Sequence, residues 1–305
     1  MSMITNELLL TEHSKVRQQW GKSLKDVLQD IQILKEWCES QKHFPEIPDD
    51  NMLEFFLTNC KYSIEKAKKN IDMYYTLPPL IPEVYEKGHP NLPGYQKKVE
   101  NFGMIVPMPK LTDSLQRVSI FAIKEDSTHF DPIMLVSHLQ NVYEIRTHVD
   151  LVMGEVLIMD GSNLKMGHVL KYTPIVFKTM VLILQNIMRN RIKEIHIFHY
   201  PPYINIVMAV AKGILKKKLY DRVYLHENLE SLYKHISPEV LPKDYGGKQK
   251  SMDELNELWK EEFIIWSDRF DKKSKMRVNE DLRPEPLENS EILGYYGNFK
   301  KLDVD

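Results

Sequence analysis

The stretch that decides the fold is HENLESL at residues 226–232, followed closely by LPKDYGG at residues 241–247. The first part is typical of a strand end that leads into a short helix. In the second part, Pro242 fixes its own φ angle, and Gly246 with Gly247 permits positive φ angles. We therefore expect a tight turn that ends a helix here. Such a turn is common by itself, whereas the full spacing of the two parts is not.

Around this stretch, the chain alternates strand-like and helix-like runs. Strands are predicted at residues 103–108, 117–124, 154–160, 194–200 and 222–226. Helices are predicted between the later strands, at residues 132–152, 172–188 and 203–219. This alternation indicates an α/β domain with a largely parallel sheet.

The two ends of the chain have a different texture. Apolar residues at helical spacing predict helices near the N-terminus, and Ser23 with Asp26 resembles a capping box. These helices are expected at residues 23–38, 51–57 and 64–75. Glycines and prolines at 88–94 indicate a linker. From Asp268 the chain is charged and contains prolines, so we expect it to lie on the surface or to be partly disordered.

Further residues strengthen the pattern around the closing turn. An FFL run stands at residues 55–57 and a YY pair at 74–75, while Asp160 is followed by Gly161 and later by a Thr-Pro pair at 173–174. Together with HENLESL and LPKDYGG, they resemble the CRAL-TRIO family from about residue 20 to residue 260. Proteins of this family hold one hydrophobic molecule in an internal pocket and carry it between membranes.

The resemblance implies a division of the chain into three parts. Residues 1–95 are expected to form an all-helical module, and residues 96–260 a CRAL-TRIO lipid-binding domain. In that α/β domain, a mostly parallel sheet would form the floor of an apolar pocket, and a helical gate would cover it. Residues 261–305 would form a charged C-terminal tail.

Composition limits the classes of function. The 305 residues are 43% apolar, enough for two domains and a sizeable core. A net charge of −2 argues against a general polyanion binder, so no nucleic-acid partner is expected. Cys38 and Cys60 lack zinc-site spacing, the N-terminus lacks the apolar run of a signal peptide, and no Asn-x-Ser/Thr acceptor occurs. We therefore predict a cytoplasmic protein with only transient membrane association.

Signals of enzyme chemistry are missing or fail on geometry. The chain has no G-x-S-x-G, Walker or H-E-x-x-H motif. His196 and His199 are three positions apart in a predicted strand, so they point to opposite faces and cannot share a metal. Asp160 at a strand end could serve a hydrolase or dehydrogenase, but no glycine-rich phosphate loop follows it. We expect no enzyme activity, no catalytic residue, no metal and no cofactor.

The run at residues 203–219 is apolar on two sides. Ile204 and Val207 lie on one helical face, while Ile206 and Val210 make a second face apolar. A helix of this kind is either buried in a core or apposed to lipid. In the family, the matching helix, here residues 203–215, is the mobile gate that covers the ligand when closed and enters a membrane surface when open.

Positive charge is concentrated near the predicted gate. Residues 189–222 hold eight basic and two acidic side chains, which form either a solvated face or a binding surface. The resemblance implies that four of them hold phosphoinositide phosphates. These are Arg191, Lys193, Lys218 and Arg222. The family often has a further arginine in the N-terminal module, but residues 56–60 read FLTNC here, so one phosphate contact is expected to be missing.

The pocket itself is predicted from strand alternation and from the resemblance. Leu157 with Met159, and Ile195 with Ile197, share strand faces. Such residues fill a core or line a cavity, and the family pattern favours a cavity. The polar members on helix 132–152 would bond a ligand hydroxyl or carbonyl, or face solvent. The expected lining residues are Met134, Ser137, His138, Asn141, Leu157, Met159, Phe177, Met180, Leu184, Ile187, Ile195, Ile197, Val207, Val210 and Ile214.

The predicted function is therefore lipid binding and transfer. One small hydrophobic ligand, such as a tocopherol, a retinoid, a carotenoid or another lipid, would be carried between membranes. The expected partners are this ligand and, transiently, a phosphoinositide-containing membrane surface, with the protein itself a monomer. The alternative is a lipid-sensing scaffold or regulator that does not transfer its ligand.

Overall fold

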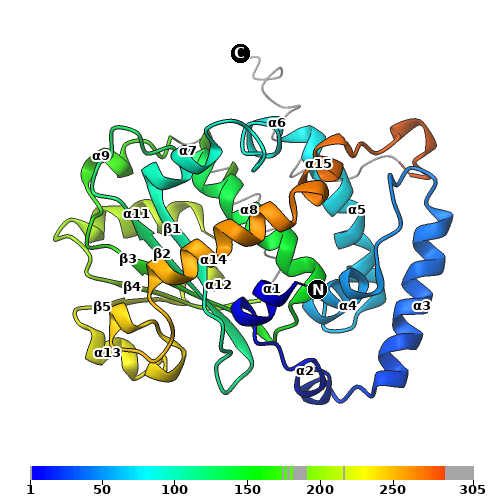
Figure 1. Cartoon of the computed structure of the whole chain (residues 1–305), viewed down its shortest axis with the longest axis horizontal. Coiled ribbons are helices and arrows are strands. Elements are labelled where there is room, and N and C mark those ends of the chain that lie inside the picture. Colours follow the sequence, from blue (N-terminus) through cyan, green and yellow to red (C-terminus); the bar gives the residue numbers. More distant parts are fainter. Residues whose placement is uncertain (1, 174, 177–178, 181–190, 216, 286–305) are drawn as a thin grey trace, which may run out of the picture.

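The computed structural model describes residues 2–173, 175–176, 179–180, 191–215 and 217–285. The N-terminal helices are α1 (Met3–Leu8), α2 (His13–Gln19), α3 (Leu24–Ser40), α4 (Asp50–Asn59), α5 (Ile64–Leu80), α6 (Pro82–Tyr85) and α7 (Tyr95–Phe102). In Figure 1, α3, α4 and α5 lie at one end of the molecule and the sheet at the other. The predicted capping box is confirmed, because Ser23 accepts from the Asp26 backbone and the Asp26 carboxylate accepts in return.

The second part is built around a five-stranded sheet with strands in sequence order. Its strands are β1 (Gly103–Pro107), β2 (Gln116–Ile123), β3 (Gly154–Asp160), β4 (Ile192–Phe198) and β5 (Val223–His226). Its helices include α8 (Pro132–Val149), α9 (Met166–Val169), α11 (Ile204–Ile214), α12 (Lys217–Tyr220), α13 (Leu229–Tyr233), α14 (Met252–Ile265) and α15 (Ser267–Lys275). Only β1 is antiparallel to its neighbour; β2 to β5 run parallel. The chain thus has the predicted α/β fold, a helical region followed by a mostly parallel sheet.

One face of the sheet is sealed. Val156 and Ile158 of β3 are fully buried and belong to the same core as Phe198 of β4. The residues packed in this core include members of α1, α13 and α14, with Leu232 and Trp259 buried among them, and also members of α8 and α15. Figure 1 shows α14 crossing this side of the sheet, with α1 beside it.

The closing stretch is tied to the central strand. Gly246 has a φ angle of 67° and ends a 3-10 helix at Lys243–Tyr245, as the predicted turn requires. Gly247 is needed for close packing instead, because a Cβ there would lie 2.0 Å from the carbonyl oxygen of Leu241. The Tyr245 hydroxyl donates to Asp160 at the end of β3 over 3.0 Å. The turn therefore fixes the segment after β5 against β3.

The C-terminal segment departs from the prediction. We expected a surface segment from Asp268, but α15 extends to Lys275 and buries Phe270 and Lys273. Arg269 bonds Glu46 and Glu144 at 2.8 Å each, and Lys273 also pairs with Glu144. These carboxylates come from the N-terminal part and from α8. Local sequence could not reveal such distant partners, and they make a charged helix part of the packed structure.

Element ends differ in two other places. The predicted helix at residues 203–219 is divided, because Leu215 has an extended backbone between α11 and α12. α7 follows directly after the expected linker and was not predicted. It contributes Tyr95 and Phe102, both buried, to the core on the second face of the sheet.

Candidate ligand and anion site

The second face of the sheet is apolar and only partly covered. The register places Leu157 beside Ile195 and Met159 beside Ile197, so the two predicted pairs lie next to each other on one face of the sheet. Leu157 is buried, the two isoleucines are half-buried, and Met159 is 43% exposed. We call these four residues the ligand face. Its incomplete cover contrasts with the sealed face on the other side of the same strands.

The other apolar residues predicted to line the pocket lie on helices, and they differ in burial and in the core that they join. Met134 of α8 is buried in the core beside the ligand face, together with Leu157. Met180 is half-buried and packs against a cluster that includes Met73 and Leu77 of α5. Three more predicted residues, Phe177, Leu184 and Ile187, lie outside the described residues.

The predicted polar residues of α8 already have protein partners. Ser137 donates to the carbonyl of Ile133 at 2.9 Å, in its own helix. Asn141 donates to the Gly88 carbonyl at 2.8 Å and contacts the Tyr95 hydroxyl at 3.0 Å. These bonds hold the segment that leads into α7. Ser137 and Asn141 are four positions apart on one face of α8, and that face meets the protein's own chain.

His138 is also engaged with this segment. Its Nδ1 lies 2.8 Å from the Tyr95 hydroxyl, and its ring packs against Phe102 and Phe263. Burial lowers the pKa of His138 to about 3, so its imidazole is neutral at physiological pH. The side chain therefore acts as a hydrogen-bonding part of the core.

The predicted gate helix, α11, presents an apolar outer face. Ile204 at its start is buried, and the preceding Tyr203 donates to the carbonyl of Leu164 at 2.6 Å. Farther along, Ile206 and Val210 are 56% and 51% exposed. Val207 is half-buried, and the Ile214 side chain lies outside the described set. The helix thus has a fixed start and an exposed apolar i, i+4 pair.

Cations gather beside the start of β4. Burial lowers the pKa of Lys193, and so do the neighbouring charges of Arg191, Arg222 and Lys61. Arg191 stacks on the Trp20 ring, with its guanidinium carbon 4.7 Å from the ring centre. Burial and Arg222 also lower the pKa of Arg191. Mutual repulsion of this kind marks a site that favours an anion.

Two features of this cation cluster, defined as Lys61, Arg191, Lys193 and Arg222, bear on anion binding. Within the described part of the chain, Nη1 of Arg191 is buried and has no hydrogen-bond partner. Arg222 uses one guanidinium nitrogen to bond the carbonyl of Ile192. The fourth predicted cation, Lys218, is exposed on α12 and makes no hydrogen bond or ion pair with described residues.

Lys61 is the residue that sequence reasoning missed. The family position falls on Cys60, which is buried and accepts from Asn70 over 3.0 Å. The next residue, Lys61, has a φ angle of 56° and an exposed side chain. This turn after α4 places a cation one residue after position 60, close enough to lower the pKa of Lys193. In the sequence, the only sign of this cation was that a lysine directly follows Cys60.

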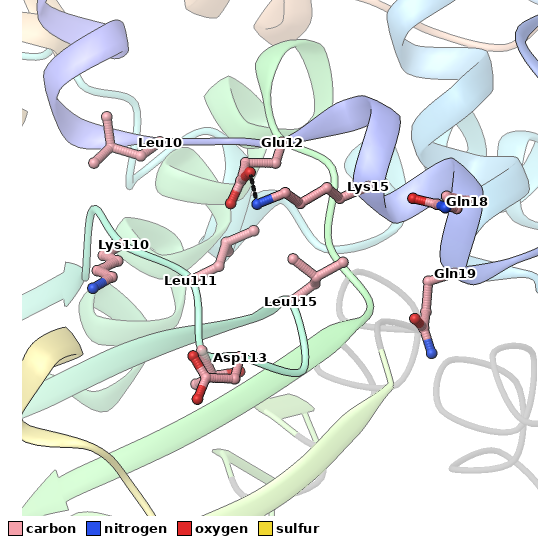
Figure 2. A pocket seen from close by; sticks show the side chains of 10 residues that line it. Leu10, Glu12, Lys15, Gln18, Gln19, Lys110, Leu111, Asp113 and Leu115 are labelled. Carbon is pink, nitrogen blue, oxygen red and sulfur yellow. Dashed lines mark ion pairs between the residues drawn. The ribbon is translucent and has the colours of Figure 1, made fainter.

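A separate hollow lies away from the ligand face. It has a volume of about 860 Å³ between the segment around α2 and the loop from β1 to β2 (Figure 2). Its walls are largely polar, and Glu12 forms an ion pair with Lys15 on one of them. The hollow is lined by Leu10, Glu12, Lys15, Gln18, Gln19, Lys110, Leu111, Thr112, Asp113 and Leu115. None of these was predicted to contact a ligand.

Among the helices that the structure describes, none is long and apolar enough to cross a bilayer. Two family models match this chain, one over its helical part and one over most of its sheet. The CRAL/TRIO domain matches residues 123–247, and the domain described as Pinta-like, UBA matches residues 23–95. The second match falls on α3 to α6.

Similar curated proteins point to the same group. Alpha-tocopherol transfer protein-like of Mus musculus is 26% identical over 249 residues, which cover 79% of this chain and 71% of that protein. Its Homo sapiens counterpart is 25% identical over 290 residues, covering 92% and 80%. Clavesin-2 of Rattus norvegicus is 27% identical over 186 residues, covering 60% and 54%.

A solved structure titled "Crystal structure of Sfh5" matches with a TM-score of 0.46 and 10% identity, covering 80% of this chain and 91% of that one. A likeness this distant says nothing about a ligand. The domain match, the relatives and the described fold agree: the chain is a CRAL/TRIO domain protein, related to the alpha-tocopherol transfer protein-like proteins and the clavesins.

Proposed function

We propose that this protein binds one small hydrophobic molecule between its ligand face and α11, and carries it between membranes. The guest belongs to the lipids with a long or polycyclic apolar body, such as tocopherols, retinoids, carotenoids or sterols. Two of the relatives carry tocopherol transfer in their names, so a tocopherol is the first ligand to test. The protein acts by binding and release, without catalysis or a cofactor.

The difference between the two faces of one sheet carries this proposal. On the sealed face, Val156 and Ile158 have no exposed surface. On the ligand face, Met159 remains 43% exposed and Ile195 and Ile197 are half-buried. Burying apolar surface is worth about 25 cal/mol per Å². An apolar guest on the ligand face would bury exposed apolar surface and gain this free energy. Val156 and Ile158 on the sealed face have no exposed surface for a guest to bury.

The cation cluster supports a second part of the proposal, recognition of phosphoinositide headgroups. A phosphate would supply acceptors for the buried Nη1 of Arg191 and relieve the repulsion among the four cations. Lys217 and Lys218 are exposed on the nearby α12. Each cation close to an anionic membrane surface contributes about 1 kcal/mol. The cluster would hold the protein where α11 can meet the membrane.

A transfer assay tests both parts. Protein loaded with a fluorescent tocopherol is mixed with acceptor vesicles of phosphatidylcholine, with or without phosphatidylinositol bisphosphate. We expect faster transfer to the vesicles that contain the phosphoinositide. The double variant Lys61→Ala, Lys193→Ala should load normally and lose that acceleration.

A matched control replaces two exposed lysines elsewhere, Lys243 and Lys248, by alanine; it should behave as the wild type. Equal wild-type rates with both kinds of vesicle would remove the phosphoinositide site. Retained ligand with vesicle binding but no transfer would favour the alternative function, a lipid sensor that keeps its ligand.

A further inference from the structure

A cluster of histidines and one carboxylate lies on the sealed side of the sheet, near its β5 edge. Glu194 and His196 of β4 point to the same side because they are two positions apart. His235 reaches them from the segment after α13. Oε2 of Glu194 lies 2.9 Å from Nε2 of His196 and 3.8 Å from Nδ1 of His235. All three atoms lie within 4.8 Å of one another, a spacing that can hold one metal ion.

Hydrogen bonding behind this cluster determines which nitrogen of His196 carries a proton. The Ser231 hydroxyl is 2.8 Å from the carbonyl of Asn228 and 3.1 Å from Nδ1 of His226. Its single hydrogen goes to the closer carbonyl, since a carbonyl can only accept. Nδ1–H of His226 therefore donates to Ser231, and Nε2 of His226 must accept.

The donor that Nε2 of His226 accepts from is Nδ1–H of His196, at 2.8 Å. Nε2 of His196 is then left with a lone pair, and it faces the Glu194 carboxylate at 2.9 Å. Two acceptors at that separation repel each other unless a cation joins them. A histidine that donates through one nitrogen and offers the other is the usual state of a metal ligand.

The available ligand atoms indicate which kind of cation fits between the two acceptors. Two imidazoles with one carboxylate suit Zn²⁺ and similar transition-metal ions, while Ca²⁺ and Mg²⁺ prefer oxygen ligands. Partial exposure of Glu194 and His235, at 34% and 35%, leaves an approach from solvent.

We propose that Glu194, His196 and His235 bind one Zn²⁺ ion, with a water as the fourth ligand. The ion would fasten the end of α13 to β4. His226 and Ser231 orient the buried ligand His196. Both residues belong to the HENLESL stretch, which would therefore support the metal site as well as the fold. The sequence contained a signal for this site, since Glu194 and His196 share one face of a predicted strand. From the sequence, only the pair His196 and His199 was considered as metal ligands, so the site was missed.

Zinc titration of the whole protein, first freed of metal with a chelator, tests the site. Isothermal titration should give one Zn²⁺ per chain, and Zn²⁺ should raise the unfolding temperature. His235→Ala and Glu194→Gln each should weaken binding by more than about 100-fold, which exceeds the loss of about 10- to 100-fold that is typical of an outer-shell partner. Both residues are partly exposed, and circular dichroism of the metal-free variants checks that they fold.

His129→Ala is the matched control, because this histidine also lies beside a carboxylate, Asp126, but is 67% exposed and alone with it in the described chain. It should bind Zn²⁺ as the wild type does. Substoichiometric binding by the wild type, or unchanged affinity in His235→Ala, would overturn the proposal. The cluster would then be a hydrogen-bonded chain in which Ser231 donates to His226.

Discussion

Individual residues show where a pattern identifies a face and where it fails to identify the neighbour. Strand alternation paired Leu157 with Met159 and Ile195 with Ile197, because period-two geometry needs no knowledge of the rest of the chain; the register then places the two pairs side by side. The polar residues of α8 were harder. Asn141 bonds the Gly88 carbonyl, 53 positions earlier, and no local pattern contains that contact.

His138 makes a prediction about pH. Its folded-state pKa is lowered from 6.5 to about 3, so its contribution to stability is complete above pH 6.5 and is lost as pH falls toward 3. Near pH 5 the loss is about 2 kcal/mol, at about 1.36 kcal/mol for each pH unit below the unfolded pKa. Urea unfolding at pH 7 and at pH 5 should show His138→Gln losing less stability than the wild type on acidification.

The comparison between proteins isolates His138 from other buried groups whose pKa burial also lowers, such as His196. An equal acid loss in the wild type and in His138→Gln would contradict the account, and the imidazole would have to be protonated in the folded state.

At the scale of elements, short apolar strands were predictable and charged or interrupted helices were not. The predicted range of β3 matches the observed one, and the other strands differ by one or two residues at their ends. α15 was missed because its packing depends on a single apolar residue, Phe270, and on carboxylates from α8 and the N-terminal part. The division between α11 and α12 was missed because both sides of Leu215 continue the helical pattern.

The outer face of α11 predicts a specific membrane defect. The double variant Ile206→Asp, Val210→Asp should bind vesicles at least several-fold more weakly, because two charges replace the apolar pair that would enter the surface. Its unfolding temperature should stay close to that of the wild type, since both side chains are more than half exposed. Vesicle sedimentation measures the binding.

The chain offers a closely matched control. Leu24 and Leu28 of α3 are also four positions apart and are 55% and 52% exposed. Replacing both by aspartate should leave vesicle binding unchanged. If the two double variants lost binding equally, exposed apolar surface in general would explain the effect, and α11 would not be the membrane-facing helix.

In the whole molecule, the two faces of the sheet lie in different environments. One side packs against α1, α13 and α14 and carries the histidine cluster at its edge; the other carries the ligand face. Charged contacts join the N-terminal part to the rest of the chain, because Arg269 of α15 pairs both with Glu46 of the N-terminal part and with Glu144 of α8. The closing stretch predicted this overall arrangement, whereas the guest and the partners depend on shapes that no motif in the chain specifies.

Native mass spectrometry of the protein isolated from cells tests the central claim most directly. We predict a one-to-one complex with a co-purified lipid in the wild type. The complex should be absent in Ile197→Arg, which places a charge on the ligand face, and retained in Ile264→Arg, which changes an isoleucine of α14 that is 72% exposed. Both variants should keep native helix content by circular dichroism. A wild type without any bound lipid, or an Ile197→Arg protein that retains it fully, would contradict the account.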